Sequence, residues 1–267
     1  GKKIMTILEE ITKKKIDRII NKKKQTSLKK LINSKPNFNQ IFNFEPILKR
    51  KNLLITEMKR QSPSGGNLDS SLNPYDQAKI YIESGTDAIS VLTEEDFFKG
   101  SNKDLEEVLK ISKKEKIPVL QKDFIIDEYQ IYESKIIGAD CILLIIKILE
   151  KQQFIDYFNI ANSLGLSVLV EIHDEKELEK ALLVDLKILG INNRNLETLD
   201  TNLATFEKIS QKVPEGIFKI AESGIKNSND AFRMINKGAN GLLVGESIMR
   251  SDNRQKLIQD ISLKNDK

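Results

Sequence analysis

Charged and amide side chains recur at the ends of short apolar runs, where they are suited to acid–base chemistry. Glu57 and Lys59 close the first run, and they project to the same side because side chains alternate along a strand. The corresponding residues of later runs are Lys122, Glu171, Asn192, and Glu222 with Ser223. Lysines and glutamates that converge at one place form either structural ion pairs or a catalytic site with shifted pKa values. We favour the catalytic site.

Two glycine-containing turns indicate a second kind of chemistry, the binding of an anion. They are Glu222-Ser223-Gly224-Ile225 and Val244-Gly245-Glu246-Ser247, which follow the last two apolar runs. Such turns, when they lead into helices, present backbone N–H groups to a phosphate. The glycines could also be ordinary turn residues, but two such turns after neighbouring runs favour a phosphate site. Its predicted residues are Ser223, Gly224, Gly245 and Glu246.

The chain has one histidine and one cysteine, which argues against a zinc site. His173 alternates with Glu171 but lies farther out in the loop, so we favour a structural or outer-shell role over that of a general base. Cys141 begins an apolar run, which favours a small buried residue over a nucleophile. We therefore expect no metal ion.

These side chains need a scaffold that brings the ends of many strands together. Eight apolar runs alternate with segments of helical periodicity, such as Asp104–Lys114, Gln152–Leu164 and Lys176–Leu183. Unbroken apolar runs suit parallel strands buried on both faces, and eight strand–helix repeats predict a closed (β/α)8 TIM barrel of the α/β class. The runs are Leu53–Met58, Ala88–Leu92, Ile117–Leu120, Cys141–Ile146, Ser167–Glu171, Leu186–Gly190, Phe218–Ala221 and Gly241–Val244.

An open, doubly wound sheet is the alternative architecture. It usually binds a dinucleotide at a glycine-rich turn after its first strand. The first run here is followed by Ser62-Pro63-Ser64-Gly65-Gly66, which lacks the G-x-G-x-x-G spacing, so we favour the barrel.

Residues 1–48 differ from the rest and are predicted to form a helical extension that packs on a barrel of residues 49–267. Ile4, Ile7, Leu8 and Ile11 recur at helical spacing, and we expect Ser27–Leu31 to continue that helix. Pro36 then breaks the pattern, and residues 37–44 are expected to be irregular. We expect the helices to cap part of the barrel and close over a ligand.

The composition limits the other classes of function. The 43 basic and 39 acidic residues give a formal net charge of +4, and the lysines at 13–15 and 22–24 either bind nucleic acid or solvate a helix face. We favour the solvated face, because no aromatic residue is interleaved and Arg18 is the only arginine between the two lysine runs. The longest apolar stretch, Cys141–Ile146, is far short of the roughly 20 residues that cross a bilayer. No secretory signal is visible, so a soluble, cytoplasmic protein is expected.

Seven ordered motifs lie at the predicted strand ends. The first three are residues 55–64 (ITEMKRQSPS), 90–101 (SVLTEEDFFKGS) and 118–127 (PVLQKDFIID). The others are 168–173 (VLVEIH), 190–196 (GINNRNL), 221–225 (AESGI) and 243–247 (LVGES). Together they resemble the indole-3-glycerol-phosphate synthase family of tryptophan biosynthesis over essentially the whole chain.

The resemblance implies a carboxy-lyase without cofactors that converts 1-(2-carboxyphenylamino)-1-deoxyribulose 5-phosphate into indole-3-glycerol phosphate, carbon dioxide and water. It implies that Lys122 is the general acid for ring closure and that Glu171 is either its paired general base or a stabiliser of positive charge. Lys59 is expected to bind the substrate carboxylate or phosphate and to donate a proton in dehydration. Glu57, Asn192, Glu222 and Ser223 are expected to position the substrate and orient the lysines.

The resemblance also implies the residues that bind the rest of the substrate. They are Ser62, Pro63, Phe97, Phe124, Leu143, Arg194 and Leu196. All of them except Ser62 and Arg194 are expected to form an apolar pocket for the anthranilate ring. Because a carboxylate repels phosphate, Glu246 is assigned only its backbone N–H, and its side chain is expected to point away. Gln121 stands where many relatives have arginine, and it is expected to point away from the barrel interior.

The rival enzyme is phosphoribosylanthranilate isomerase, which shares the barrel and the phosphate site. That reaction uses a cysteine and an aspartate near strand ends, whereas here the only cysteine begins the fourth run. A non-enzymatic nucleic-acid-binding protein would leave the polar strand ends unexplained. The expected partner is therefore a small phosphorylated molecule, bound by a monomer that can associate with other enzymes of the tryptophan pathway, with no nucleic acid and no membrane.

Overall fold

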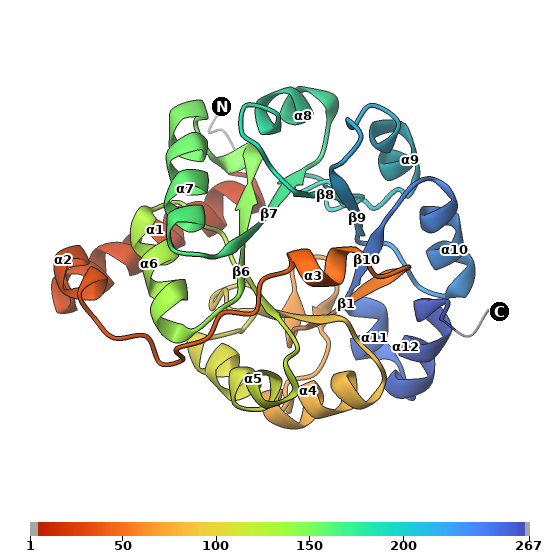
Figure 1. Cartoon of the computed structure of the whole chain (residues 1–267), viewed down its shortest axis with the longest axis horizontal. Coiled ribbons are helices and arrows are strands. Elements are labelled where there is room, and N and C mark those ends of the chain that lie inside the picture. The colour runs from red at the N-terminus through yellow and green to blue at the C-terminus, as the bar shows by residue number, and fades with distance from the viewer. Residues whose placement is uncertain (1–4, 265–267) are drawn as a thin grey trace.

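The computed structural model describes residues 5–264, and its central feature is a closed barrel of eight parallel strands (Figure 1). The strands are β1 (Leu53–Met58), β4 (Ala88–Leu92), β5 (Val119–Lys122), β6 (Cys141–Ile145), β7 (Ser167–Ile172), β8 (Ile188–Asn192), β9 (Phe218–Glu222) and β10 (Gly241–Val244). Around the barrel they follow the order β1-β10-β9-β8-β7-β6-β5-β4, and β1 closes it by pairing with both β10 and β4. The predicted (β/α)8 architecture is confirmed.

Four strands end beyond the apolar runs that predicted them; β7 and β9 do so by one residue and two others by two. β5 reaches Lys122 and β8 reaches Asn192, each two residues beyond its predicted run. The reason is that the backbone ladder continues through the polar residues, pairing Lys122 with Leu92 and Asn192 with Glu222. These polar side chains therefore project from rigid strands rather than from loops.

Helices cover the outside of the barrel (Figure 1). They are α4 (Pro74–Glu83), α5 (Asn102–Glu115), α6 (Glu128–Ile137), α7 (Lys151–Ser163), α8 (Glu175–Ala181), α9 (Ala204–Ser210), α10 (Ser228–Asn236), α11 (Glu246–Arg250) and α12 (Arg254–Ser262), with a 3-10 turn, η1 (Ile146–Ile148), after β6. Polar caps begin most of them, although α9 and α11 have no side-chain cap: Ser101, for example, accepts a hydrogen bond from the backbone N–H of Asp104. Within the described part of the chain, no helix is both long and apolar enough to span a membrane.

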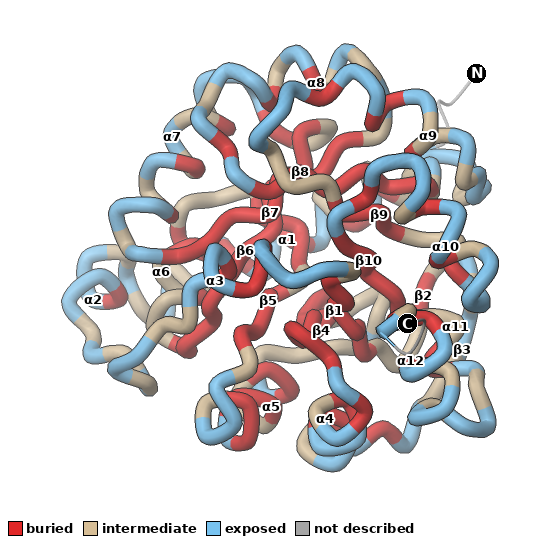
Figure 2. The backbone as a smooth tube through the Cα atoms, turned by 45° about the vertical axis from the view of Figure 1, so that its right-hand side comes forward, coloured by how far each residue is buried: buried red, intermediate tan, exposed pale blue. Residues whose placement is uncertain are grey.

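Apolar side chains fill two layers, one between strands and helices and one inside the barrel. Figure 2 shows the strands buried along most of their length, while the helices expose their outer faces. The outer layer contains fully buried aromatic residues such as Tyr81, Phe154 and Phe206. Inside the barrel, residues such as Ile55 and Leu169 pack together below the polar mouth. Burying such side chains contributes about 1.5–3 kcal/mol each, which makes the barrel a rigid platform.

Between residue 5 and the barrel lie three helices: α1 (Ile7–Gln25), α2 (Leu28–Ile32) and α3 (Glu45–Leu48). Thr6 and Glu9 form a capping box that starts α1, whereas Ile4 lies outside the described residues. The prediction that Ser27–Leu31 continues α1 is wrong. The Ser27 side chain instead accepts a hydrogen bond from the Lys30 N–H and so begins α2 as a separate helix.

The first and third helices lie at opposite ends of the barrel. Near α3, the Phe44 N–H donates to the Ser167 hydroxyl at the start of β7, with 3.0 Å between nitrogen and oxygen. In α1, Leu8 and Ile11 belong to the same apolar cluster as Phe124, which follows β5. The extension therefore closes the amino-terminal end of the barrel with α3 and borders its carboxyl-terminal mouth with α1.

The expectation of a solvated lysine face on α1 is wrong at Lys15, whose exposed fraction is only 4%. The physical reason is a pair of carboxylates, Asp123 and Glu95, each with one oxygen 2.9 Å from the Lys15 ammonium nitrogen. Two further lysines of the run, Lys22 and Lys23, form ion pairs with barrel residues. The lysine-rich sequence of α1 thus attaches this helix to the barrel.

Candidate active site

One ammonium group lies at the centre of the barrel mouth, surrounded by carboxylates from three strands. The Lys122 nitrogen is 3.7 Å from Glu57 Oε2, 3.9 Å from Glu171 Oε2 and 3.7 Å from Glu222 Oε2. All three glutamates are buried. Because these separations exceed those of a direct hydrogen bond, the ammonium is attracted to all three carboxylates without being tightly bound to one. It keeps hydrogen-bonding capacity for a ligand.

The protonation of Lys122 follows from this surrounding charge. Burial opposes a charged ammonium, but the carboxylates of Glu57, Glu171 and Glu222 outweigh that effect and raise the pKa of Lys122 above its usual value. Lys122 is therefore a cation at neutral pH and can only donate a proton.

Glu57 is held as an anion by Lys59, which directly follows β1, by Ser90 of β4 and by Lys122 of β5. Its Oε1 lies 3.0 Å from the Lys59 nitrogen, and its Oε2 accepts a 2.8 Å hydrogen bond from the Ser90 hydroxyl. Burial opposes the charge, yet Lys122, Lys59 and Ser90 together lower the pKa of Glu57. Glu57 thus orients both lysines without exchanging protons near neutral pH.

Glu171 and Glu222 form a pair whose pKa values move in opposite directions. Burial opposes charge on Glu171, but Lys122 and His173 lower its pKa, and Asn192 donates to its Oε1 at 3.2 Å. Glu222 accepts no hydrogen bond from the described residues, and burial together with the charge of Glu171 raises its pKa well above the usual value. The geometry therefore favours an ionised Glu171 beside a protonated Glu222, a separation typical of acid–base sites.

His173 lies between two carboxylates. Its Nε2 is 3.3 Å from Glu171 Oε1, and its Nδ1 is 3.1 Å from Glu177 Oε2. Burial opposes its charge, but Glu171 and Glu177 raise the pKa of His173 to about 9. The sole histidine is therefore a cation that supports the charge on Glu171.

Replacing His173 with glutamine is expected to lower the free energy of unfolding by about 3 kcal/mol at pH 6, because a pKa raised from 6.5 to about 9 stabilises the fold by that amount below pH 6.5. This contribution is lost as the pH rises through 9, so the two proteins should differ little at pH 10. Urea unfolding of both proteins at pH 6, 8 and 10 measures the difference. A deficit that stays constant across this range contradicts a charged His173.

Asn192 connects the catalytic cluster to the turn after β9. Its side-chain oxygen accepts a 2.8 Å hydrogen bond from the Ser223 hydroxyl and a 3.0 Å hydrogen bond from the Arg194 N–H. Ser223 itself has a positive φ of 66°, a conformation that is uncommon outside glycine. These bonds hold the turn in a shape that directs Ser223 toward Asn192.

A cavity of about 600 Å³ opens above the cluster. Most of the residues predicted for the site line it: Glu57, Lys59, Lys122, Phe124, Leu143, Glu171, Asn192, Arg194, Leu196, Glu222, Ser223, Gly224, Gly245 and Glu246. Ser62, Pro63 and Phe97 do not line it. Ser62 is buried in the β2–β3 hairpin (Gln61–Ser62 and Gly66–Asn67), where its hydroxyl accepts a hydrogen bond from the Gly65 N–H. Phe97 faces Lys14, whose nitrogen is 5.1 Å from the ring centroid.

The cavity has an apolar side and a basic side. On the apolar side, Phe124 follows β5 and Leu143 belongs to β6. These two strands lie across the barrel from β9 and β10. The opposite side carries the turns of Gly224 and Gly245, together with the basic residues Lys59, Arg194, Lys226 and Arg250. A ligand with an aromatic end and an anionic end fits this division.

Glu246 lies among the basic groups but is neutralised by them. Its Oε2 is 3.1 Å from Arg194 Nη2, and its Oε1 is 3.2 Å from Arg250 Nε. Burial opposes its charge, but Arg194 and Arg250 lower the pKa of Glu246. Its carboxylate is therefore tied to two arginines, and its predicted role as a backbone donor stays a prediction.

Sequence reasoning missed several residues that shape this cavity. Ser90 does not line the cavity but donates to Glu57, and it could have been found because it occupies an inward position of β4. Phe98, Lys226 and Arg250 lie in loops or a short helix, where periodicity carries no signal, although Phe98 neighbours a predicted residue. Gly190 stands inside β8, and a glycine in a strand marks a close approach of another group.

That group is the Glu222 carboxyl. A Cβ atom placed on Gly190 would lie 1.9 Å from Glu222 Oε1, which is far inside van der Waals contact. Gly190 therefore makes room for the side chain of the neighbouring strand.

Neither Gln121 nor Cys141 lines the cavity. Gln121 is buried outside the barrel interior, where its amide donates to the Thr93 hydroxyl at 3.1 Å and to Asn102 Oδ1 at 3.2 Å. Cys141 is fully buried in the barrel, and burial raises the pKa of its thiol. The thiol is therefore not a nucleophile.

Comparisons with a family model and with curated proteins give the same family. A family model described as "Indole-3-glycerol phosphate synthase" matches residues 8–261. A curated protein of that name from Thermoanaerobacter pseudethanolicus is 41% identical over 257 residues, covering 96% of this chain and 94% of that protein. Another from Legionella pneumophila is 40% identical over 259 residues, covering 96% of this chain and 98% of its own length.

Solved structures support the fold alone. A thiamine phosphate pyrophosphorylase from Pyrococcus furiosus superposes with a TM-score of 0.60 at 15% identity, covering 78% of this chain and 93% of that one. An N-acetylmannosamine-6-phosphate 2-epimerase from Clostridium perfringens gives a TM-score of 0.59 at 16% identity, covering 81% and 94%. At such identities the likeness concerns the barrel and not its chemistry.

Proposed function

The chain belongs to the indole-3-glycerol phosphate synthase family, and from this premise we propose how its barrel mouth performs the decarboxylating ring closure of tryptophan biosynthesis. The family predicted from the seven motifs is confirmed, and the isomerase alternative is set aside. The observation that carries the mechanism is the position of the Lys122 ammonium among three buried carboxylates, between an apolar and a basic wall.

The substrate we propose is 1-(2-carboxyphenylamino)-1-deoxyribulose 5-phosphate. Its ring packs against Phe124, Leu143 and Leu196, while its phosphate binds the N–H groups of the turns at Gly224 and Gly245. The two walls are on opposite sides of the barrel, and this separation supports a single extended pose. The proposed scheme uses only groups that line this one cavity, so it does not require a second copy of the chain.

Ring closure needs an acid at the ketone oxygen while the aromatic carbon attacks. We assign this proton to Lys122, which is charged at neutral pH and keeps hydrogen-bonding capacity for the ligand. The alkoxide that develops is a stronger base than a lysine amine, so the transfer is favourable despite the raised pKa of Lys122. Loss of carbon dioxide then restores the aromatic ring.

Dehydration requires a second donor and an acceptor. Lys59 is assigned the donor role, because its ammonium adjoins Glu57 at the cavity wall. The ionised Glu171 either accepts a proton or stabilises positive charge on the substrate nitrogen. Glu222, Asn192 and Ser223 hold the geometry. A proton accepted by Glu171 passes back to one of the two lysines, and solvent supplies one proton to the other, because converting the substrate carboxylate into carbon dioxide consumes one proton overall. Each well-placed acid or base accelerates the reaction by about 10²–10⁴.

Turnover of the phosphorylated substrate and of its dephosphorylated analogue tests both halves of this proposal. We expect indole fluorescence to appear with one carbon dioxide released per indole, and the signal is easily read because the chain contains no tryptophan. The analogue should show a KM raised by about 100-fold, since hydrogen bonds to a charged group contribute about 1.5–3 kcal/mol each. A folded protein that forms no indole contradicts the mechanism, and an unchanged KM contradicts the phosphate site.

A further inference from the structure

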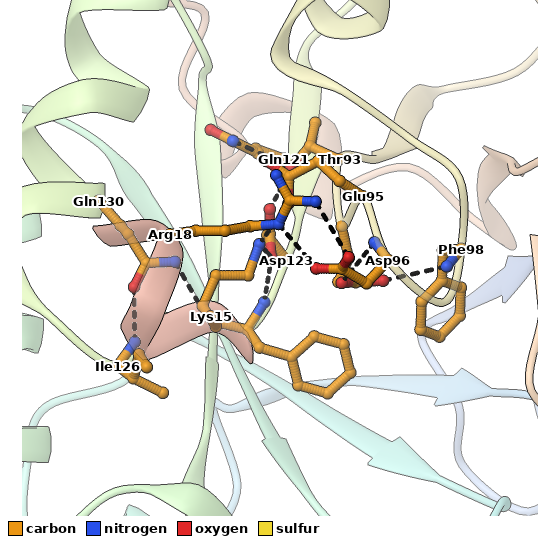
Figure 3. Close-up of polar contacts among 12 residues, drawn as sticks. Lys15, Arg18, Thr93, Glu95, Asp96, Phe98, Gln121, Asp123, Ile126 and Gln130 are labelled. Carbon is orange, nitrogen blue, oxygen red and sulfur yellow. Dashed lines mark hydrogen bonds and ion pairs between the residues drawn. The ribbon is translucent and has the colours of Figure 1, made fainter. Parts of the chain in front are cut away.

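The buried lysine of α1, Lys15, connects this helix to two loops at the barrel mouth. Figure 3 shows its side chain reaching toward Asp123 and Glu95. Its nitrogen lies 2.9 Å from Asp123 Oδ1 and 2.9 Å from Glu95 Oε2. Burial opposes the charge, but the two carboxylates outweigh it and raise the pKa of Lys15. The contact is thus a fixed, fully charged bridge between segments far apart in the sequence.

Asp123 is the first partner, and it lies between Lys122 and Phe124. Its Oδ1 also accepts a 2.7 Å hydrogen bond from the Phe124 N–H. Its Oδ2 accepts a 2.7 Å hydrogen bond from the Thr93 hydroxyl, and both residues are labelled in Figure 3. These three contacts fix the direction in which the chain leaves β5. The same short segment carries Lys122 and a residue of the apolar wall, so the bridge controls where both side chains project.

Glu95 is the second partner, and it belongs to the loop after β4. Arg18 of α1 holds the next residue of this loop with two hydrogen bonds to Asp96, 2.7 Å from Nε and 3.0 Å from Nη2. The loop continues to Phe98, which lines the cavity with its ring centroid 6.1 Å from that of Phe124. The helix therefore also holds the second part of the apolar wall.

We propose that Lys15 is a positioning residue for the ring-closure reaction, acting through Asp123 and Glu95 to place Lys122 and the aromatic wall. The proposal rests on the role assigned to Lys122. Lys22 of the same helix provides the contrast. It pairs with Glu133 of α6 at 2.8 Å, which attaches α1 to the barrel without reaching the mouth.

The test compares Lys15→Met with Lys22→Met in the full chain, because each variant removes one α1 ammonium and its ion pairing. Lys15→Met is expected to reduce kcat by about tenfold to a hundredfold, since a misplacement of about 1 Å can cost 10²-fold in rate. Its KM should also rise several-fold. Lys22→Met should keep both constants within twofold of the wild type. Steady-state indole formation is measured well below the unfolding temperature, with circular dichroism as the check on folding.

Glu95→Gln tests the Lys15–Glu95 contact separately from the Lys15–Asp123 contact. It also replaces Lys15→Met as the test if that variant does not fold. It weakens only the loop after β4, so KM should rise several-fold while kcat is retained. A folded Lys15→Met variant with both constants near wild type overturns the proposal, as does an unchanged KM in Glu95→Gln. Lys122→Met is measured in parallel. If that variant stays active, the assigned acid is wrong, whereas its inactivity beside a normal Lys15→Met refutes only the positioning role.

Discussion

Lys122→Met is expected to lose about two to four orders of magnitude in kcat while the barrel remains folded, the usual cost of removing a general acid. Methionine keeps an unbranched apolar stem that is one atom shorter than the lysine side chain, but it cannot donate a proton to the ketone oxygen. The variant also removes the charge shared by Glu57, Glu171 and Glu222, so their pKa values should rise. Indole formation measures kcat, and a thermal melt confirms the fold.

Lys187→Met is the matched control for this experiment. Lys187 precedes β8 at the opposite end of the barrel, and its nitrogen pairs with the exposed Asp185. This variant should retain wild-type kcat and KM. If Lys122→Met instead turns over normally, the acid is Lys59, and Lys59→Met should then be the inactive protein.

Gly190→Ala is expected to lower kcat/KM by about 100-fold although it adds a single methyl group. The new Cβ would stand 1.9 Å from Glu222 Oε1, so the carboxyl must leave its place beside Glu171 and Lys122. A displacement of about 1 Å in a catalytic group is sufficient for a loss of this size. Steady-state kinetics with the phosphorylated substrate provide the measurement.

Two further variants make the result specific. Gly190→Ala combined with Glu222→Asp should recover part of the activity, because the shorter side chain avoids the added methyl group. Gly85→Ala controls for a general loss of stability, since Gly85 has a φ of 87° and lies in open space. That control should unfold more easily yet keep its kcat/KM. Gly190→Ala with near wild-type kinetics would show that Glu222 does not need its present position.

The barrel and the polar groups at its mouth could be predicted because their signals are local. Alternation places Glu57 and Lys59 on one side of a strand, and apolar runs mark the strands themselves. The ladder beyond an apolar run could not be predicted, since Lys122 stays in β5 through its pairing with a neighbouring strand. The same limit applies to protonation, because the contrast between Glu171 and Glu222 arises from burial and from partners on other strands.

Long-range partners explain the remaining differences. Lys15 has no local mark that separates it from the lysines beside it, and its burial depends on two carboxylates at distant positions of the chain. Gly190 resembles an ordinary glycine until the register of β8 and β9 brings Glu222 close to it. In both cases the sequence contains the residue, but only the packing of separate elements gives it a function.

The closure of the barrel by β1 and β10 has a consequence for the order in which the protein is made. The ribosome releases β1 early, but its ladder with Gly241–Val244 cannot form until most of the chain has been synthesised. Until then, one side of β1 is an unpaired edge that can pair with another chain. The catalytic cluster spans strands from β1 to β9, so the nascent chain acquires activity only near the end of translation, and premature termination before β10 yields an inactive product with an open sheet.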